Sequence, residues 1–409
     1  MKALYHYCTG ESHLATGKPC QDCAYAESTA HYSMAIVSDG HGGERYFRSQ
    51  FGSNFLVKIT KEALKVFAAA SEEGQIPLSG KTFTQFGVGD SSFEPGNRVI
   101  HDRLMWLFSS IINQWNQSIA EHAHANELTQ WEQEHVSEEY KEEFLTKRNN
   151  PDATFEKTYG CTLMAYLQTS HYWLAFQLGD GKLVTMHEEN DAIVFKQPVP
   201  WDDRCFLNKT TSICDSDALH EFRYCYQGDG QFPMAAFLGS DGIDDSYGDG
   251  EYLNNFYANL FKQIIKSGQE EAWRVLKKSL PQISKVGSKD DMSVACVYDD
   301  SNLRHDFHQV VSYQKHNLMN KKEQVHLRIT ELIAKVEKLS SGNLSDNGPS
   351  VEYQYALKDL DKAHKLKDRI RKQMKELDGE LERFENSCKR MKPSRSVDRH
   401  KTMSSLRKK

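Results

Sequence analysis

Carboxylate residues stand at the ends of apolar runs at four places in the chain. Asp39 follows the run SMAIVS, Asp180 follows LAFQLG and Asp241 follows AAFLGS, and a glycine comes after each. Asp290 lies just before the run MSVACV. Any one Asp-Gly pair is also a common turn. Together they favour strand ends that meet in one cleft, where carboxylates bind a hard cation such as Mg²⁺ or Mn²⁺.

The elements expected around these residues are short strands and amphipathic helices. Strand-length apolar runs recur up to Asp300, and only the link QTSH separates CTLMAYL from YWLAFQL, which favours an antiparallel sheet. The Gly- and Ser-rich segment 71–97 predicts a long loop. Helical spacing of apolar residues, or an acidic and polar composition, predicts helices over residues 49–70, 103–120, 130–147 and 252–280.

Beyond Asp300 the apolar residues step by threes and fours, as in the seam of a coiled coil. One series runs over residues 325–339 and a second over residues 353–384, with the breaker-rich turn SSGNLSDNGPS between them. Two helices joined by so short a link fold back as an antiparallel hairpin. The alternative is a pair of ordinary amphipathic helices packed on the body of the protein.

The net charge of −6 is unevenly distributed. Residues 388–409 contain nine Lys and Arg and one acid, Asp398, so this segment carries +8 and the rest of the chain −14. We therefore expect three parts: a mixed α and β domain at 1–303, a helical coiled-coil hairpin at 304–387, and a basic, disordered tail at 388–409. The tail has no aromatic residue on which bases could stack, which argues against a nucleic-acid partner.

The cysteines and the apolar runs indicate a setting for the protein. Nine cysteines are spread without the spacing of a disulfide framework, which predicts a reducing, cytoplasmic location. Cys20 and Cys23 form a lone C-x-x-C, a weak zinc signal because no second close pair accompanies it. The N-terminal residues lack the apolar core of a secretory signal, and no apolar run reaches the roughly 20 residues that span a bilayer. We expect no membrane segment.

Six motifs in order resemble those of the metal-dependent protein phosphatases of the type 2C class. They lie within residues 12–298 and read GKPCQDCAYA, VSDGHGG, YGCTLMAYL, FQLGDGKLV, FLGSDGIDDSY and KDDMSVACV. The resemblance implies an α+β fold for the phosphatase domain at 1–303. That fold is a four-layer α/β/β/α sandwich, with two antiparallel sheets flanked by helices.

The resemblance also implies two Mn²⁺ or Mg²⁺ ions at one end of the sandwich. Asp39 is expected to bridge both ions. Asp241 and Asp290 are expected to complete the ligands of the first ion, and the Gly40 carbonyl is expected to bind the second ion. A metal-bridging water would attack phosphorus, and His41 would protonate the leaving oxygen as general acid. A third, weaker metal is expected at Asp180, Asp241 and Asp245.

Two positions depart from the family pattern. Gln21 stands where the family has a glutamate, so it adds no charge to the second metal site, although Asp22 remains. Lys18 lies near the place of the family's phosphate-binding arginine, and a lysine lacks the arginine's bidentate fork. The alternative phosphate-binding residues are His13 and Arg45.

These features predict an intracellular, bacterial, Mn²⁺- or Mg²⁺-dependent phosphatase that acts on phosphoserine and phosphothreonine in proteins. Its partners would be phosphoprotein substrates, a cognate Ser/Thr kinase, and a protein or second copy bound through the coiled coil. The alternative is a catalytically weak or inactive scaffold of the same fold that binds phosphoproteins or partners through its helical extension. Gln21 and the missing arginine favour the scaffold, whereas Asp39, His41 and Asp241 favour the enzyme.

Overall fold

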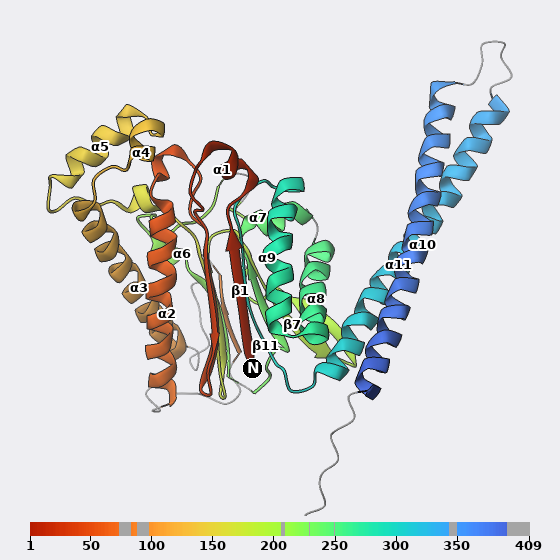
Figure 1. Ribbon diagram of the computed structural model, residues 1–409, viewed down its shortest axis with the longest axis horizontal. Coiled ribbons are helices and arrows are strands. Elements are labelled where there is room, and N and C mark those ends of the chain that lie inside the picture. The colour runs from red at the N-terminus through yellow and green to blue at the C-terminus, as the bar shows by residue number, and fades with distance from the viewer. Residues whose placement is uncertain are drawn as a thin grey trace, which may run out of the picture. The chain divides into compact units, whose positions relative to one another are not determined.

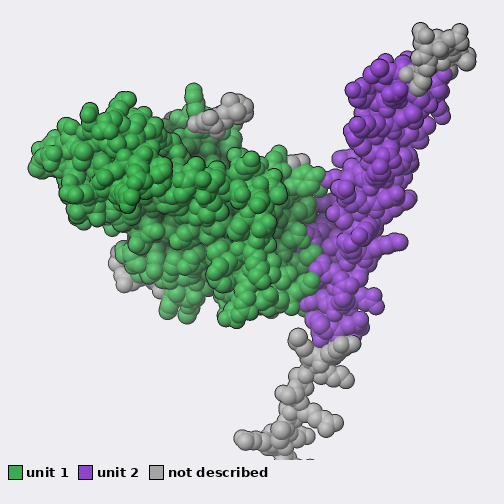
Figure 2. All heavy atoms as spheres, turned by 45° about the horizontal axis from the view of Figure 1, so that its top comes forward, with its two compact units in different colours: residues 1–306 green, residues 307–409 purple. Residues whose placement is uncertain are grey.

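The computed structural model describes residues 1–72, 83–87, 98–205, 209–228, 230–248, 250–342 and 350–390. It divides into two compact units, Met1–Asp306 and Phe307–Lys409 (Figure 2). Most of the loop predicted at 71–97 lies outside the described residues. Inside them the loop prediction is wrong for Phe83–Phe86, which form a strand. Residues 391–409 of the predicted tail also lie outside.

Two antiparallel sheets form the centre of the first unit (Figure 1). In one sheet the strand order is β1 (Lys2–Cys8), β11 (Met292–Tyr298), β10 (Ala235–Gly239), β7 (Lys182–Glu189) and β8 (Ala192–Lys196). In the other sheet the order is β2 (Cys23–Ser28), β3 (Tyr32–Ser38), β5 (Leu163–Thr169), β6 (Trp173–Leu178), β9 (Arg223–Gln227) and β4 (Phe83–Phe86).

The alternation of side chains along a strand explains the layers. Met34 and Ile36 on β3 belong to a core shared with the helices outside the sheet, whereas Ala35 and Val37 belong to the core between the two sheets. Successive residues of a strand point to opposite faces, so β3 is apolar on both sides and is covered on both. In the sheet that contains β10, Phe237 stacks on Tyr257 of an outer helix, with ring centroids 4.8 Å apart. The predicted four-layer sandwich is confirmed.

Helices cover the outer faces of both sheets (Figure 1). The 3₁₀ turns span Glu44–Tyr46 and Glu156–Tyr159. The helices are α1 (Glu11–Thr16), α2 (Ser49–Glu72), α3 (Arg98–Ala125), α4 (Gln130–His135), α5 (Glu138–Arg148), α6 (Ala218–Glu221), α7 (Asp241–Tyr247), α8 (Gly250–Ser267) and α9 (Gln269–Val286).

Two stretches that were each predicted as one helix are broken. The helix predicted over 252–280 is divided by Gly268, whose φ of +81° cannot continue a helix. The stretch 130–147 is divided at Val136, which is extended and buried. No helix in the described part of the chain is long and apolar enough to cross a membrane.

A buried ion pair anchors the start of α2 to α4. Arg48 Nε lies 2.8 Å from Glu132 Oε1, and Arg48 Nη2 lies 3.0 Å from Glu132 Oε2. Both side chains are 1% exposed. Glu132 also closes a capping box with Thr129 at the start of α4. The pair therefore holds the segment that follows the Asp39-Gly-His motif.

We expect Arg48→Met to lower the free energy of unfolding by about 3–5 kcal/mol, because it leaves the Glu132 carboxylate buried without its cation. Urea unfolding measures the change. Replacing both residues with methionine should restore part of the loss, since no lone buried charge remains. Arg274→Met, which breaks exposed pairs with Glu270 and Glu271, is the control and should change stability by less than about 1 kcal/mol. An equal effect of both single variants would contradict the prediction.

The second unit consists, in its described residues, of two long helices. They are α10 (Leu303–Gly342), which begins just before the unit boundary, and α11 (Val351–Arg390). Val325 and Ile370 are buried in one apolar cluster, and Phe307 stacks on Phe384 with ring centroids 3.9 Å apart. The start of α10 thus meets the end of α11, so the helices are antiparallel. The helical extension is confirmed, while a coiled-coil geometry stays a prediction.

Candidate active site

The ends of several strands bring acidic residues to one end of the sandwich. β3 ends at Ser38, opposite Cys23 at the start of β2, so Asp39 and Asp22 lie beyond neighbouring strand ends. β10 ends at Gly239, opposite Val294 near the start of β11, so Asp241 follows one strand and Asp290 precedes the other. Antiparallel pairing thereby gathers residues that are far apart in the chain.

The acids Asp22, Asp39 and Asp241 act directly on one another. Burial, and then the charges of Asp22 and Asp241, hold the pKa of Asp39 well above its usual range. Burial, and then the charges of Asp291 and Asp241, do the same to the pKa of Asp22. Burial raises the pKa of Asp241 to about 6, and hydrogen bonding with Asp39 opposes the rise. Like charges are thus crowded where water is scarce.

Several oxygen atoms in this cluster are buried without a hydrogen bond. Both carboxylate oxygens of Asp22, Oδ1 of Asp241 and Oε1 of Gln21 make no hydrogen bond of good geometry among the described residues. The Ser240 and Ser293 side chains lie near enough to Asp22 to oppose the rise of its pKa. Asp22 is only 4% exposed. Buried polar atoms are normally hydrogen-bonded, and exceptions mark an ion or a functional role. Oxygen donors with crowded negative charge are the set that a hard divalent cation needs, so these residues fit Mg²⁺ or Mn²⁺.

Asp180 and Asp245 lie close enough to Asp241 to raise its pKa through their charges. Burial raises the pKa of Asp180 itself, and burial followed by the charge of Asp290 raises that of Asp245. The structure therefore brings together the three residues expected to hold a third metal. The neighbouring Asp244 pairs instead with Lys182, whose Nζ lies 3.6 Å from Asp244 Oδ2.

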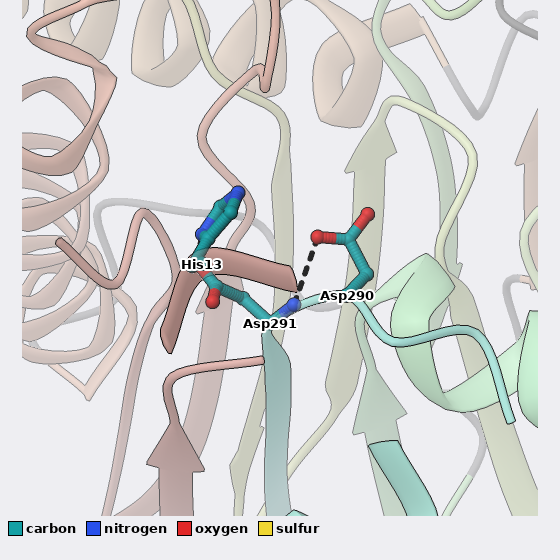
Figure 3. Close-up of side chains that lie close together, drawn as sticks. All are labelled: His13, Asp290 and Asp291. Atoms are coloured by element: carbon teal, nitrogen blue, oxygen red, sulfur yellow. Dashed lines mark hydrogen bonds and ion pairs between the residues drawn. The ribbon is translucent and has the colours of Figure 1, made fainter. Parts of the chain in front are cut away.

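Asp290 and Asp291 have opposite environments at the start of β11 (Figure 3). Asp290 is exposed, and its Oδ1 accepts a hydrogen bond of 2.8 Å from the Asp291 amide. Asp291 is buried, and it accepts hydrogen bonds from the amides of Gly10 (2.7 Å) and Gln21 (2.6 Å). His13 Nδ1 lies 3.0 Å from Asp291 Oδ2. Burial alone would raise the pKa of Asp291, but these hydrogen bonds outweigh it and lower the pKa.

Asp291 therefore fastens the N-terminal segment that carries Gln21 and Asp22 to the start of β11. This role could not be predicted from the sequence, because nothing near Asp291 in the chain indicates that Gly10 and Gln21 are its partners. His13, Asp290 and Asp291 offer potential metal-binding atoms within 4.8 Å of one another. Nδ1 of His13 already lies beside Asp291, and phosphate binding by His13 stays a prediction.

Gln21 and Gly40 are packed directly together. The Gln21 side-chain amide donates to Ser49 Oγ, and the Gln21 carbonyl accepts a hydrogen bond of 2.6 Å from Ser53 Oγ. A Cβ atom on Gly40 would lie 2.6 Å from that carbonyl oxygen, so a side chain at this position would push the two segments apart. Ser49 Oγ also donates to the His41 carbonyl at 3.0 Å. The start of α2 thus supports both segments.

His41 lies deep in the site with one ring nitrogen engaged. Its Nε2 lies 2.7 Å from Oγ of Ser212, a residue that no motif in the sequence indicated. The ring packs edge-on against Tyr46, with centroids 4.8 Å apart. Burial lowers the pKa of His41 to about 4, and the charge of Asp215 opposes this shift. The imidazole is therefore neutral near pH 7 unless an anion binds beside it.

The cationic candidates for phosphate binding lie in different places. Lys18 Nζ donates to the Gly42 carbonyl at 2.7 Å, one residue beyond His41. Burial lowers the pKa of Lys18, while the charges of Asp291 and Asp290 oppose the shift. Arg45 instead lies 3.7 Å from a carboxylate oxygen of Glu143. Lys18 therefore contacts the Asp39-Gly-His-Gly loop directly.

The cysteine pair carries no sign of metal chemistry. None of the nine cysteines forms a disulfide. Burial, and then the charge of Asp22, raise the pKa of the Cys23 thiol to about 12 and also raise that of Cys20. Thiolates are the form that binds zinc. The weak zinc signal of Cys20 and Cys23 therefore finds no support in their surroundings.

Comparison with known proteins adds a family match. Residues 9–283 match the sequence model of the family described as Protein phosphatase 2C. No curated protein matches the chain significantly. Among solved structures, the Staphylococcus aureus serine/threonine phosphatase Stp1 is 14% identical, with 74% of this chain and 96% of that chain covered and a TM-score of 0.40.

Two further solved structures are similar at the same level. The Mycobacterium tuberculosis serine/threonine phosphatase PstP/Ppp is 11% identical, with 72% of this chain and 97% of that chain covered and a TM-score of 0.37. The catalytic domain of the phosphatase PstP in complex with 2 manganese ions is 12% identical, with 73% and 98% covered and a TM-score of 0.39.

Proposed function

Because the chain belongs to the protein phosphatase 2C family, we propose that it hydrolyses phosphoserine and phosphothreonine in proteins with the help of two Mn²⁺ or Mg²⁺ ions. One observation carries this proposal: buried carboxylate oxygens of Asp22 and Asp241 make no hydrogen bond of good geometry among the described residues, and they lie at the strand ends beside Asp39. A divalent cation would satisfy these atoms and relieve the repulsion among the acids.

The ligands divide between the two ions according to the motif that each residue occupies. Asp39 would bridge both ions, and Asp241 and Asp290 would complete the first. The Gly40 carbonyl, Asp22 and Gln21 would hold the second, where Gln21 would contribute a neutral oxygen. A third, weaker site would use Asp180, Asp241 and Asp245.

His41 would supply the proton for the leaving serine or threonine oxygen. When bound, the metal ions supply positive charge at the phosphate and lower the pKa of the attacking water. The anionic substrate favours the charged imidazolium, which counters the effect of burial on His41. Lys18, held at the Gly42 carbonyl, offers a point charge for the phosphate in place of the family's arginine.

The direct test is hydrolysis of a phosphothreonine peptide by the full chain in Mn²⁺. We expect phosphate release that EDTA stops and excess Mn²⁺ restores. The alternative function, a catalytically weak scaffold, rests on Gln21, which replaces a charged ligand by a neutral one. Binding of the phosphopeptide without any metal-dependent release of phosphate would overturn the enzyme and favour the scaffold.

We further propose that the helical extension serves association rather than catalysis. The acidic cluster lies before residue 303, and the helices expose Leu327, Val351 and Tyr355 by 61%, 69% and 64%. These side chains would bind a cognate kinase or a second copy of the chain. The nine free cysteines fit the cytoplasmic setting proposed for such partners.

A shortened chain that ends at Leu303 should hydrolyse p-nitrophenyl phosphate within about twofold of the full-length rate, because small aryl substrates need only the metal site. Sedimentation equilibrium of both chains would show whether self-association is lost with the helices. The full chain carrying Tyr355→Glu and Leu327→Glu is the control that keeps the helices. An insoluble or metal-independent shortened chain would contradict the proposed division at 303.

A further inference from the structure

We propose that Ser212 is a positioning residue that holds His41 in the tautomer protonated at Nε2 and leaves Nδ1 to exchange a proton with the leaving oxygen. This inference rests on the proposed function, because it assigns a partner to the general acid named there. The structural half of the inference, which is the tautomer of His41, can be measured even if the protein hydrolyses no substrate.

The hydrogen bonds around Ser212 Oγ decide where the protons lie. Ser212 is 2% exposed, and its Oγ lies 2.7 Å from His41 Nε2 and 3.0 Å from the Cys161 carbonyl. The Cys214 amide donates to the same oxygen at 3.3 Å. A hydroxyl has one proton to donate and two lone pairs to accept. The carbonyl can only accept, so it takes the Ser212 proton, and His41 Nε2–H is left as a donor to Oγ.

One alternative for the hydroxyl proton is the Cys214 sulfur, 3.1 Å away. A thiol sulfur is a weak acceptor, so it does not compete with the carbonyl at 3.0 Å. Either acceptor uses the single Ser212 proton. His41 Nε2 acts as the donor in both arrangements. In a third arrangement the Ser212 hydroxyl would donate to His41 Nε2, which would leave Ser212 Oγ and the Cys161 carbonyl oxygen 3.0 Å apart with no proton between them. Two acceptor oxygens repel each other at that distance, so this contact favours the arrangement in which His41 Nε2 is the donor.

Ser212 is itself fixed by its own backbone. The Ser212 amide donates to Asp215 Oδ2 at 2.9 Å, and Asp215 also accepts from Lys157 Nζ at 2.9 Å. The amide of Ile213 donates to the Cys161 carbonyl at 3.1 Å. The loop that carries Ser212 is thus tied to Cys161, two residues before β5, and these bonds hold it without His41.

The same short segment, residues 160–162, also fixes His41 and Asp39. The His41 amide donates to the Gly160 carbonyl at 3.1 Å, and the Thr162 amide donates to the Asp39 carbonyl at 2.8 Å. A Cβ atom on Gly160 would lie 2.9 Å from His41 Cδ2. The ring is therefore enclosed by Gly160, Tyr46 and Ser212. These contacts hold the ring with Nε2 toward Ser212.

The tautomer matters because of the order in which protons move. In the acid form both ring nitrogens carry a proton. As the bond from phosphorus to the leaving oxygen breaks, its electron pair goes to that oxygen, which takes the proton from Nδ1. The neutral ring that remains is protonated at Nε2, the tautomer that the Ser212 hydrogen bond stabilises. Among the described residues, Nδ1 has no hydrogen-bond partner that would compete for this proton.

The test combines nuclear magnetic resonance with kinetics. Long-range ¹H–¹⁵N correlation spectra of histidine-labelled full chain in Mg²⁺ report the tautomer, and the His41 signal is identified by its absence in His41→Ala. We expect neutral His41 to be protonated at Nε2 in the wild-type protein and to shift toward the Nδ1–H form in Ser212→Ala. Ser212→Thr keeps a hydroxyl and should keep the Nε2–H form.

Ser212→Ala should also lower kcat on a phosphothreonine peptide by about tenfold, which is part of the roughly 10²–10⁴-fold that general acid catalysis supplies. The rate on p-nitrophenyl phosphate should change by less than about twofold, because its leaving group needs no proton. Ser33→Ala is the control, because Ser33 is a buried serine of β3 that lies at the opposite end of the strand from Asp39. It should leave the tautomer and both rates unchanged.

The outcomes separate this inference from the proposed function. A wild-type His41 protonated at Nδ1, or a tautomer unchanged in Ser212→Ala, overturns the role of Ser212 whatever the activity. Equal losses on both substrates in Ser212→Ala also overturn it, because a lesion in folding or metal binding would produce them. A chain that hydrolyses no phosphoester but shows the Nε2–H tautomer overturns the proposed function and supports the structural half of the inference.

Discussion

Asp39→Asn should lower hydrolysis of a phosphothreonine peptide by roughly 10³-fold or more, because the proposed role of the Asp39 carboxylate is to hold the metal ions that would supply several kcal/mol of charge stabilisation. Asp241→Asn should have an effect of similar size. Asparagine has nearly the same shape as aspartate, so the loss would come from charge rather than from packing. Isothermal titration with Mn²⁺ should show weakened or absent binding in both variants.

A measurement of the free energy of unfolding shows whether the lost activity comes from lost metal binding or from a damaged fold. Each substitution removes a negative charge from a buried cluster of like charges, so the free energy of unfolding in EDTA should rise rather than fall. Asp102→Asn, at an exposed position of α3, is the control and should change neither activity nor Mn²⁺ binding. Full activity of Asp39→Asn would contradict the assignment of the metal site.

His41→Ala should lower the rate on a phosphothreonine peptide by roughly 10²–10⁴-fold, the usual contribution of a general acid. The effect on p-nitrophenyl phosphate should be much smaller, because nitrophenolate leaves without needing a proton. Steady-state kinetics on both substrates, at one Mn²⁺ concentration, give the comparison. Mn²⁺ affinity should stay near the wild-type value, since His41 is not expected to be a ligand.

His220→Ala is the matched control, because His220 is an exposed histidine whose partner is the nearby Asp217. It should leave both rates unchanged. Equal losses on the two substrates in His41→Ala would argue against proton donation and for a general role of His41 in shaping the site.

Local patterns made the fold and the acidic motifs predictable. The apolar run of β3 and the hairpin link between β5 and β6 are properties of a few neighbouring residues, and they predicted strands and an antiparallel sheet. The confirmed sandwich was implied by the resemblance of the six motifs to those of the phosphatase family. The motif of Asp39 and His41 is also local. The individual ligand and catalytic roles stay predictions, because geometry without metal or substrate does not assign them.

Partners that are distant in the chain could not be predicted in this way. His41 and Ser212 are 171 residues apart, and Asp291 and Gly10 are 281 apart. Serines and aspartates are common in loops, and nothing beside Ser212 or Asp291 distinguishes them. The break between α4 and α5 at Val136 could not be predicted for a related reason. Burial of the Val136 side chain depends on the fold and not on its sequence neighbours.

The first and last strands of the first unit are partners: β1 pairs with β11 from Lys2 opposite Tyr298 to Cys8 opposite Met292, and Asp291 holds Gly10 and Gln21. During translation β1 therefore has no pairing strand until β11, near the end of the first unit, has left the ribosome. A nascent chain shorter than Asp291 lacks both the strand and the carboxylate that fix Gln21 and Asp22. Synthesis of residues 307–409 then takes roughly 5–20 s at typical bacterial and eukaryotic speeds. The first unit thus has these seconds in which to close while the helical unit is still being made, and protein synthesis cut short before β11 would yield no active fragment.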